Sequence, residues 1–170
     1  MPVLVTPDQI AQLAPSARSS YRDAFAAGQS VPDQFEISAT PLRVAYFIAR
    51  MMHESGGLTI QFENLNYSPE RLPKVWPSRL QPKGPLDPAQ FAHNPERLAN
   101  HVDAQAELGN TAPGDGFKYR GRGLLQLTGK DSYDEATRIL RQSFPDAPDF
   151  IADPDQVISA DWYLTKSCCG

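Results

Sequence analysis

Apolar residues recur at helical spacing through the first third of the chain. Between residues 41 and 55, Phe47, Met51 and Glu54 fall at i, i+4 and i+7, which places them on one face of a helix. A globular protein buries such a face, so the pattern predicts that this helix packs against the core. An earlier apolar stripe begins near residue 16 and stops at Gly28, which favours a second helix.

Proline placement marks where the helices begin. Residues with capping side chains stand directly before several prolines, as in an N-cap followed by the first helical position, where the missing N–H of proline is harmless. These pairs are Thr6-Pro7, Thr40-Pro41, Ser68-Pro69, Asp87-Pro88, Asn94-Pro95 and Asp153-Pro154. The expected helices cover residues 7–14, 16–28, 41–55, 69–76, 88–93, 95–108, 131–143 and 154–168. The sequence therefore predicts a mainly α fold.

Glycines recur through residues 110–129 and leave no room for a long helix there. We expect short extended pieces that form a hairpin near residues 117–128. The core candidates in this stretch are Leu124, Leu125 and Leu127. If the segment is extended, Gln126 and Thr128 lie on one face of it.

Length and composition exclude several classes of protein. A chain of 170 residues is expected to form one domain over residues 1–170 with a substantial core, and we expect a monomer. The formal charge of −4 is unlike the net positive charge typical of proteins that bind nucleic acid, so nucleic acid is not an expected partner. No apolar run approaches the ~20 residues that a helix needs to cross a bilayer.

The cysteines and histidines give no sign of a metal or cofactor site. Cys168 and Cys169 are adjacent, which suits neither a structural disulfide nor a spaced ligand set. His53, His93 and His101 also lack ligand spacing. We therefore expect no metal and no cofactor.

Two glutamates are candidates for an acid/base pair. Glu54 is expected on the buried helical face, at the last turn before Gly56, where apolar neighbours and the negative end of the helix dipole both disfavour ionisation. Such a setting keeps a carboxylic acid protonated so that it can donate a proton. Glu63 follows on a loop beside polar Asn64. The alternative is that Glu54 is an ordinary solvated surface residue.

Six motifs in order carry a family resemblance. They are His-Glu-Ser-Gly-Gly (53–57), Glu-Asn-Leu-Asn-Tyr-Ser (63–68), Trp-Pro-Ser-Arg-Leu (76–80), Leu-Ala-Asn (98–100), Gly-Asp-Gly (114–116) and Tyr-Arg-Gly-Arg-Gly-Leu-Leu-Gln-Leu-Thr-Gly (119–129). Together they resemble family 19 glycoside hydrolases, the chitinase-type enzymes with a lysozyme-like, two-lobed helical fold. The close spacing of the two glutamates is similar to the bacteriophage and prophage endolysin branch of that family.

The resemblance implies a role for each matching residue. Glu54 matches the general acid, Glu63 the general base, and Thr128 a hydroxyl that helps to hold the attacking water. The implied substrate-binding residues are Gln126, Tyr119, Asn100, Tyr67 and Arg122. For Tyr67 and Arg122 a purely structural role is the alternative. The family also continues past Trp162-Tyr163 with a further helical segment, so we expect this chain to lack a C-terminal segment of the family domain.

The resemblance implies a bacteriolytic enzyme that hydrolyses β-1,4 links of peptidoglycan with inversion. Chitin is the alternative substrate, and an inactive sugar-binding module with the same fold is the alternative function. The N-terminal residues lack the positive region and long apolar run of a signal peptide. We therefore expect synthesis in the cytoplasm and release towards the cell wall or periplasm through a holin or a secretion system.

Overall fold

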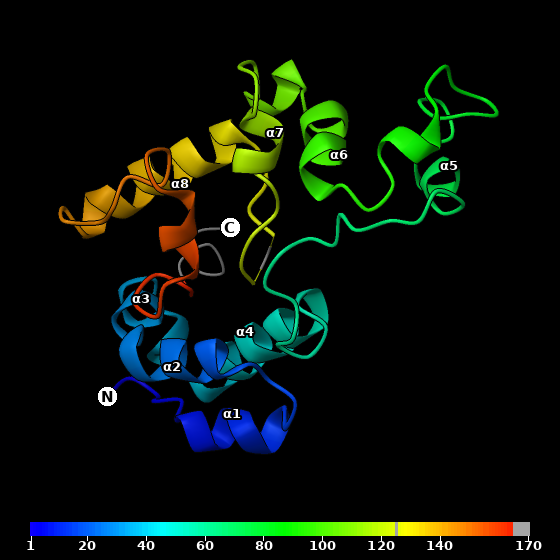
Figure 1. The fold of residues 1–170 in the computed structure, drawn as a ribbon. Coiled ribbons are helices and arrows are strands. Elements are labelled where there is room, and N and C mark those ends of the chain that lie inside the picture. The colour runs from blue at the N-terminus through cyan, green and yellow to red at the C-terminus, as the bar shows by residue number, and fades with distance from the viewer. Residues whose placement is uncertain (125, 165–170) are drawn as a thin grey trace.

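A computed structural model describes residues 1–124 and 126–164. The chain forms two helical lobes joined by a crossing segment that includes Phe62 (Figure 1). This arrangement confirms the predicted mainly α, two-lobed fold. No helix among the described residues is long and apolar enough to cross a membrane.

The lower lobe holds the first helices of the chain. Its elements are α1 (Pro7–Leu13), α2 (Ser19–Ala27), α3 (Ser30–Gln34), the 3₁₀ helix η1 (Ile37–Ala39) and α4 (Pro41–Glu54). Helix α4 buries Val44, Ile48 and Met51 against Ile10 and Tyr21. The buried stripe of α4 is therefore offset from the predicted one, and Phe47 is only partly buried against this core.

The upper lobe contains the remaining helices. Its elements are α5 (Leu72–Val75), η2 (Pro88–Gln90), α6 (Pro95–Val102), η3 (Ala106–Leu108), α7 (Asp115–Lys118), α8 (Lys130–Ser143) and η4 (Pro154–Ile158). Two apolar clusters hold it together. Leu72 of α5 packs with Leu98 of α6, whereas Tyr133 and Leu140 of α8 pack with Phe150.

The capping side chains explain most of the helix starts. Five of them accept hydrogen bonds from backbone N–H groups two or three residues ahead: Thr6, Thr40, Asp87, Asn94 and Asp153. The pair Ser68-Pro69 instead begins a turn, and α5 starts only at Leu72.

The helix expected over 88–93 ends early, at Gln90 of η2, and two longer expected helices end well before their predicted ends. The helix expected over 95–108 stops at Val102, because side chains of Gln105 and Arg79 donate to the carbonyl of Val102 at 2.6 and 2.7 Å and satisfy the helix end. The helix expected over 154–168 is the short 3₁₀ helix η4, after which the chain turns and buries Leu164 in the lower lobe. Residues 165–168 of that prediction lie outside the described part.

The glycine-rich segment forms a minimal antiparallel hairpin between the lobes, as expected. Arg122 and Leu127 exchange backbone hydrogen bonds of 3.1 and 2.8 Å, and Arg122 also bridges to Phe62 of the crossing segment. Leu124 enters the core of the lower lobe, while Leu127 enters the core of the upper lobe. The hairpin (yellow in Figure 1) thus ties the two lobes together. Leu125 lies outside the described residues.

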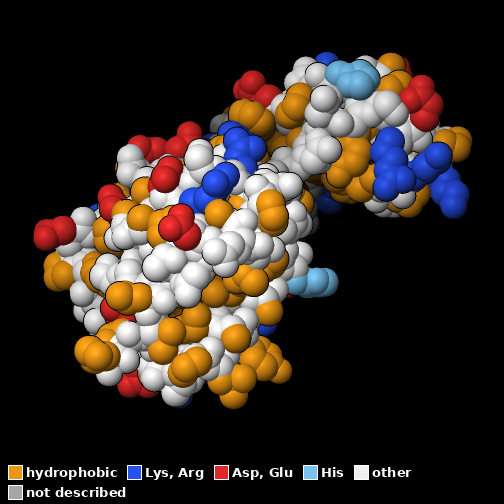
Figure 2. Space-filling model, turned by 90° about the horizontal axis from the view of Figure 1, so that it is seen from below, with side chains coloured by type: hydrophobic (Ala, Val, Ile, Leu, Met, Phe, Trp, Pro, Cys, Tyr) orange, Lys and Arg blue, Asp and Glu red, His pale blue; other side chains and the backbone are white. Residues whose placement is uncertain are grey.

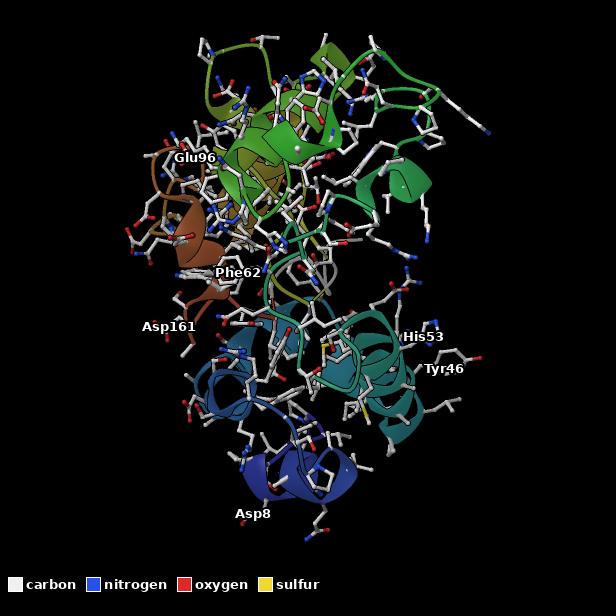
Figure 3. All side chains as sticks on the ribbon, turned by 45° about the vertical axis from the view of Figure 1, so that its right-hand side comes forward. Asp8, Tyr46, His53, Phe62, Glu96 and Asp161 are labelled. Atoms are coloured by element: carbon white, nitrogen blue, oxygen red, sulfur yellow. The ribbon has the colours of Figure 1, made fainter. Side chains whose placement is uncertain are left out.

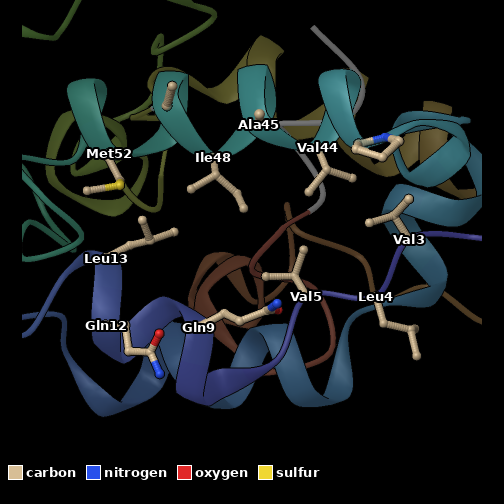
Figure 4. A pocket seen from close by; sticks show the side chains of 12 residues that line it. Val3, Leu4, Val5, Gln9, Gln12, Leu13, Val44, Ala45, Ile48 and Met52 are labelled. Carbon is tan, nitrogen blue, oxygen red and sulfur yellow. The ribbon is translucent and has the colours of Figure 1, made fainter.

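An apolar groove of about 540 Å³ lies between the N-terminal segment, α1 and α4 (Figure 4). Leu13, Ile48 and Met52 are among its lining residues. Seen from below, hydrophobic side chains are spread over the face of the molecule that includes the lower lobe (Figure 2).

Candidate active site

Glu54 is the last residue of α4, and its side chain is exposed. His53 and Tyr46 on the same helix also project towards solvent (Figure 3). The expectation that Glu54 lies on a buried apolar face is therefore wrong. The helical stripe that reaches the core continues from Met51 to Ser55, one residue beyond Glu54. No described residue forms a hydrogen bond or ion pair with the Glu54 carboxylate.

Ser55 directs the chain from α4 into the crossing segment. Its buried hydroxyl donates to the carbonyl of Met51 at 2.5 Å and accepts from the N–H of Leu58 at 3.0 Å. Leu58, with φ of 64°, is fully buried in the lower lobe. This tight reversal sends residues 59–63 away from α4 and towards the hairpin.

Glu63 is held by the hairpin. Its carboxylate Oε1 accepts a hydrogen bond of 2.5 Å from the N–H of Gly121, and its own N–H donates to the carbonyl of Gly121 at 3.0 Å. The side chain is half-buried. A residue on a loop is therefore fixed in position by a partner 58 residues further along the chain.

The side chains of Gln126 and Thr128 both approach Gly121, the residue that holds Glu63. A Cβ atom added to Gly121 would lie 2.8 Å from Gln126 Oε1, 3.1 Å from Thr128 Oγ1 and 3.2 Å from Glu63 Cβ. Gln126 has φ of 50° and lies in the turn of the hairpin, so the segment is not simply extended there. The Thr128 hydroxyl donates to the carbonyl of Gln126 at 2.8 Å, which leaves its oxygen able to accept a further hydrogen bond.

Two charged side chains lie close to Glu63. The Arg120 guanidinium stacks over the rings of Phe117 and Phe62, at 4.1 and 5.0 Å from the ring centroids. Burial, then the neighbouring Arg122 cation, lowers the pKa of Arg120, while the Glu63 carboxylate is among the groups that oppose this. Burial first and the charge of Glu63 second raise the pKa of Asp103 to about 6.

Tyr119 and Arg122 have structural roles. Tyr119 is buried, and its hydroxyl donates to the carbonyl of Ile151 at 3.2 Å. The buried Arg122 side chain forms a 2.7 Å ion pair with Asp155 and donates to the hydroxyl of Tyr133. Both side chains are almost fully buried, which favours the structural role for each, and their contacts with substrate stay predictions.

Asn100 and Tyr67 belong to the upper lobe and are half-buried. Asn100 Oδ1 accepts from the N–H of Phe117 at 2.8 Å, which joins α6 to α7, while the residue also lines two shallow hollows. The ring of Tyr67 packs edge-on against Trp76. Among the described residues, no group of three or more His, Cys, Asp or Glu side chains is arranged to hold a metal ion.

Sequence reasoning missed Asp103, Arg120 and Arg79. Asp103 follows α6 and is 40 residues from Glu63, so no local spacing connects the two. Signals existed for the two arginines, because Arg120 lies in the motif of residues 119–129 and Arg79 in the motif of residues 76–80.

Comparison with known proteins agrees with the motif resemblance. A stretch of 94 residues is 45% identical to a protein of Haemophilus influenzae named "Glycosyl hydrolase family 19 domain-containing protein". The stretch covers 54% of this chain and 46% of that protein, so the chain spans about half the length of the relative it matches. No family model matches the chain. Over about half its length, the chain is similar to a family 19 glycosyl hydrolase domain-containing protein.

Proposed function

We propose that this chain is a glycoside hydrolase of the family 19 type, in which Glu54 is the general acid and Glu63 is the general base. The observation that supports this most strongly is the hydrogen bond from the Gly121 N–H to the Glu63 carboxylate. The side chains of Gln126 and Thr128 also lie close to Gly121. This hydrogen bond from Gly121 holds one oxygen of the Glu63 carboxylate in a fixed position, and the other oxygen can accept a proton from water, as a general base requires. The named relative supports the reaction class.

The proposed reaction is a single displacement with inversion. The Glu63 carboxylate accepts a proton from a water molecule, whose oxygen attacks the anomeric carbon from one face of the sugar. Glu54 donates its proton to the glycosidic oxygen as the bond to the leaving sugar breaks. The Thr128 oxygen accepts a hydrogen bond from the same water and orients it towards the anomeric carbon.

We propose peptidoglycan as the substrate and chitin as the alternative. Binding a long chitin chain by stacking requires exposed aromatic platforms, and both tryptophans are half-buried, with Trp76 packed on Tyr67 and Trp162 on Phe144. We expect purified sacculi to be cleaved at least about tenfold faster than colloidal chitin, which corresponds to about 1.4 kcal/mol in the activation free energy. Release of soluble fragments from both polymers measures this ratio. Equal or faster release from chitin would reverse the assignment.

An inactive sugar-binding module is a second candidate, because the Glu54 carboxylate has no polar partner among the described residues. The two candidates differ in what they do to permeabilised Gram-negative cells. A hydrolase lowers the turbidity of the suspension, whereas a binding module sediments with purified sacculi and leaves turbidity unchanged. Glu63→Gln is the matched control, because it should bind like the unmodified protein but not hydrolyse.

A further inference from the structure

Arg120 has a side chain that the mechanism above does not use. Its guanidinium carbon Cζ lies 4.1 Å from the centroid of the Phe117 ring and 5.0 Å from that of the Phe62 ring. Its Nη1 atom donates to the carbonyl of Phe117 at 2.9 Å. All three side chains are half-buried, and stacking of a guanidinium on aromatic rings is stronger where the groups are partly shielded from water. These contacts therefore hold the Arg120 side chain in place.

The two rings belong to segments that lie on either side of this contact. Phe62 directly precedes Glu63 in the crossing segment. Phe117 lies in α7, and its N–H donates to Asn100 Oδ1 of α6 at 2.8 Å. The Arg120 side chain thus joins the crossing segment to the α6–α7 part of the upper lobe.

The backbone of Arg120 is also fixed. Its carbonyl accepts hydrogen bonds from the hydroxyl of Tyr133 at 2.8 Å and from Nη1 of Arg122 at 3.3 Å. The next residue, Gly121, forms hydrogen bonds with both the N–H and the carboxylate of Glu63. Arg120 therefore contacts the ring directly before Glu63, while its neighbour in the chain binds Glu63 itself.

Other contacts keep the crossing segment near the hairpin when Arg120 is replaced. The N–H of Gly123 donates to the carbonyl of Gln61 at 2.9 Å. The Arg122 guanidinium also lies 5.8 Å from the centroid of the ring directly before Glu63. We therefore expect that loss of the Arg120 guanidinium loosens the position of Glu63 without unfolding the protein.

We propose that Arg120 is a positioning residue that keeps the Glu63 carboxylate on the Gly121 N–H. It does so by holding the ring of Phe62, and with it the crossing segment, beside that of Phe117. The inference rests on the proposed role of Glu63 as the base. A base acts only within hydrogen-bond distance of its proton, and a displacement of about 1 Å can cost about 10²-fold in rate. A purely structural role of Arg120 would change stability alone, and a sugar contact would change KM rather than kcat.

Hydrogen exchange of backbone amides, followed by ¹H–¹⁵N NMR of the full chain, tests this role without any activity. The buried Gly121 N–H bonds to Glu63, whereas the Leu127 N–H bonds within the hairpin. In Arg120→Met we expect the Gly121 amide to exchange about tenfold faster and the Leu127 amide to keep its rate. In Glu63→Ala the Gly121 amide has lost its acceptor, so adding Arg120→Met should cause no further acceleration. Equal changes at both amides, no change at Gly121, or further acceleration in the double variant would overturn the inference.

The effect on catalysis is read from kcat and KM on purified sacculi. Arg120→Met should lower kcat about tenfold, which corresponds to about 1.4 kcal/mol, and leave KM within about twofold. Phe62→Leu should do the same, and the double variant should be no slower than the slower single variant, because both changes remove one contact. Arg97→Met is the matched control and should keep full activity, since its guanidinium stacks on Phe91 at 5.3 Å on the surface of the upper lobe.

An Arg120→Met protein with unchanged kcat, whether KM is raised or not, overturns the proposal. If Arg120→Met does not fold, Arg120→Lys takes its place in both experiments with the same expected directions, because it keeps the charge but not the planar guanidinium. If the folded unmodified protein hydrolyses neither sacculi nor chitin, the proposed function fails. The exchange of the Gly121 amide alone then decides whether Arg120 holds Glu63 in position.

Discussion

At the end of α4, Glu54 projects from the last helical turn into solvent without a polar partner among the described residues, whereas Glu63 on the crossing segment is held by the backbone of Gly121. The helix positions Glu54 by local structure alone. The loop residue depends on a hydrogen bond across 58 residues of chain. Under the proposed mechanism, the base would therefore be held in place before substrate binds, whereas the acid would gain polar neighbours only from the bound sugar.

The largest effect should come from replacing Arg122, which stabilises the hairpin that holds Glu63. Arg122 is buried and bonds to Asp155, Tyr133 and the carbonyl of Lys118 at the base of the hairpin. Arg122→Met removes these bonds and leaves the carbonyl of Lys118 without this donor, so it should lower the free energy of unfolding by about 3 kcal/mol, measured by urea denaturation. Arg138→Met is the control, because its pair with Glu135 is exposed and worth less than about 1 kcal/mol. Similar losses for both arginines would mean that the hairpin needs no buried arginine.

Exchanging each glutamate for glutamine tests the comparison directly. Glu54→Gln removes the proton donor and Glu63→Gln removes the base, so each should lower turnover of sacculi by about 10²-fold or more while the fold is retained. Glu96→Gln, on the surface of α6, should keep full activity. Circular dichroism checks the fold of each variant.

Azide distinguishes the two roles. A small anion can attack in place of the activated water in Glu63→Ala or Glu63→Gly, which gives a glycosyl azide with inverted configuration, but it cannot replace an acid at residue 54. Product analysis by NMR identifies the azide and its configuration. Azide rescue confined to the Glu54 variants would show that the roles are reversed.

Features that depend on local sequence could be predicted, and those that depend on distant contacts could not. The start of α4 could be predicted from Thr40, because its side chain accepts a hydrogen bond from the N–H of Arg43, only three residues away. The exposure of Glu54 was missed because the helical stripe was placed one residue out of register with the core that α4 meets. The same limit applies to the end of α6, where Arg79 from a separate loop donates to the carbonyl of Val102.

A smaller effect is expected at Thr128, whose hydroxyl lies close to Gly121, the glycine that holds Glu63. Thr128→Val keeps the shape of the side chain but removes the oxygen that would orient water, so turnover should fall by about tenfold with a change of less than about 1 °C in Tm. Ser159→Ala is the matched control, because that hydroxyl also donates to a nearby carbonyl but lies on the C-terminal segment after η4. A Thr128→Val protein with full activity and a lowered Tm would show that the hydroxyl has only a structural role.

The smallest effect concerns Asp103, at the end of α6, and the dependence of protein stability on pH. The pKa of Asp103 is raised to about 6 in the folded protein, so the folded state holds this proton more tightly than the unfolded chain does. The resulting stabilisation is complete below pH 3.8 and is lost as the pH rises through 6.

Asparagine resembles the neutral acid at every pH, so Asp103→Asn should match the unmodified protein at pH 4. At pH 7.5 it should melt about 2–4 °C higher, as expected for about 1 kcal/mol after allowance for the partial exposure of Asp103. Asp161→Asn, on the exposed C-terminal segment, provides the control in the same calorimetric series. A Tm difference for Asp103→Asn that stays constant from pH 4 to pH 7.5 would mean that burial of Asp103 does not oppose its ionisation.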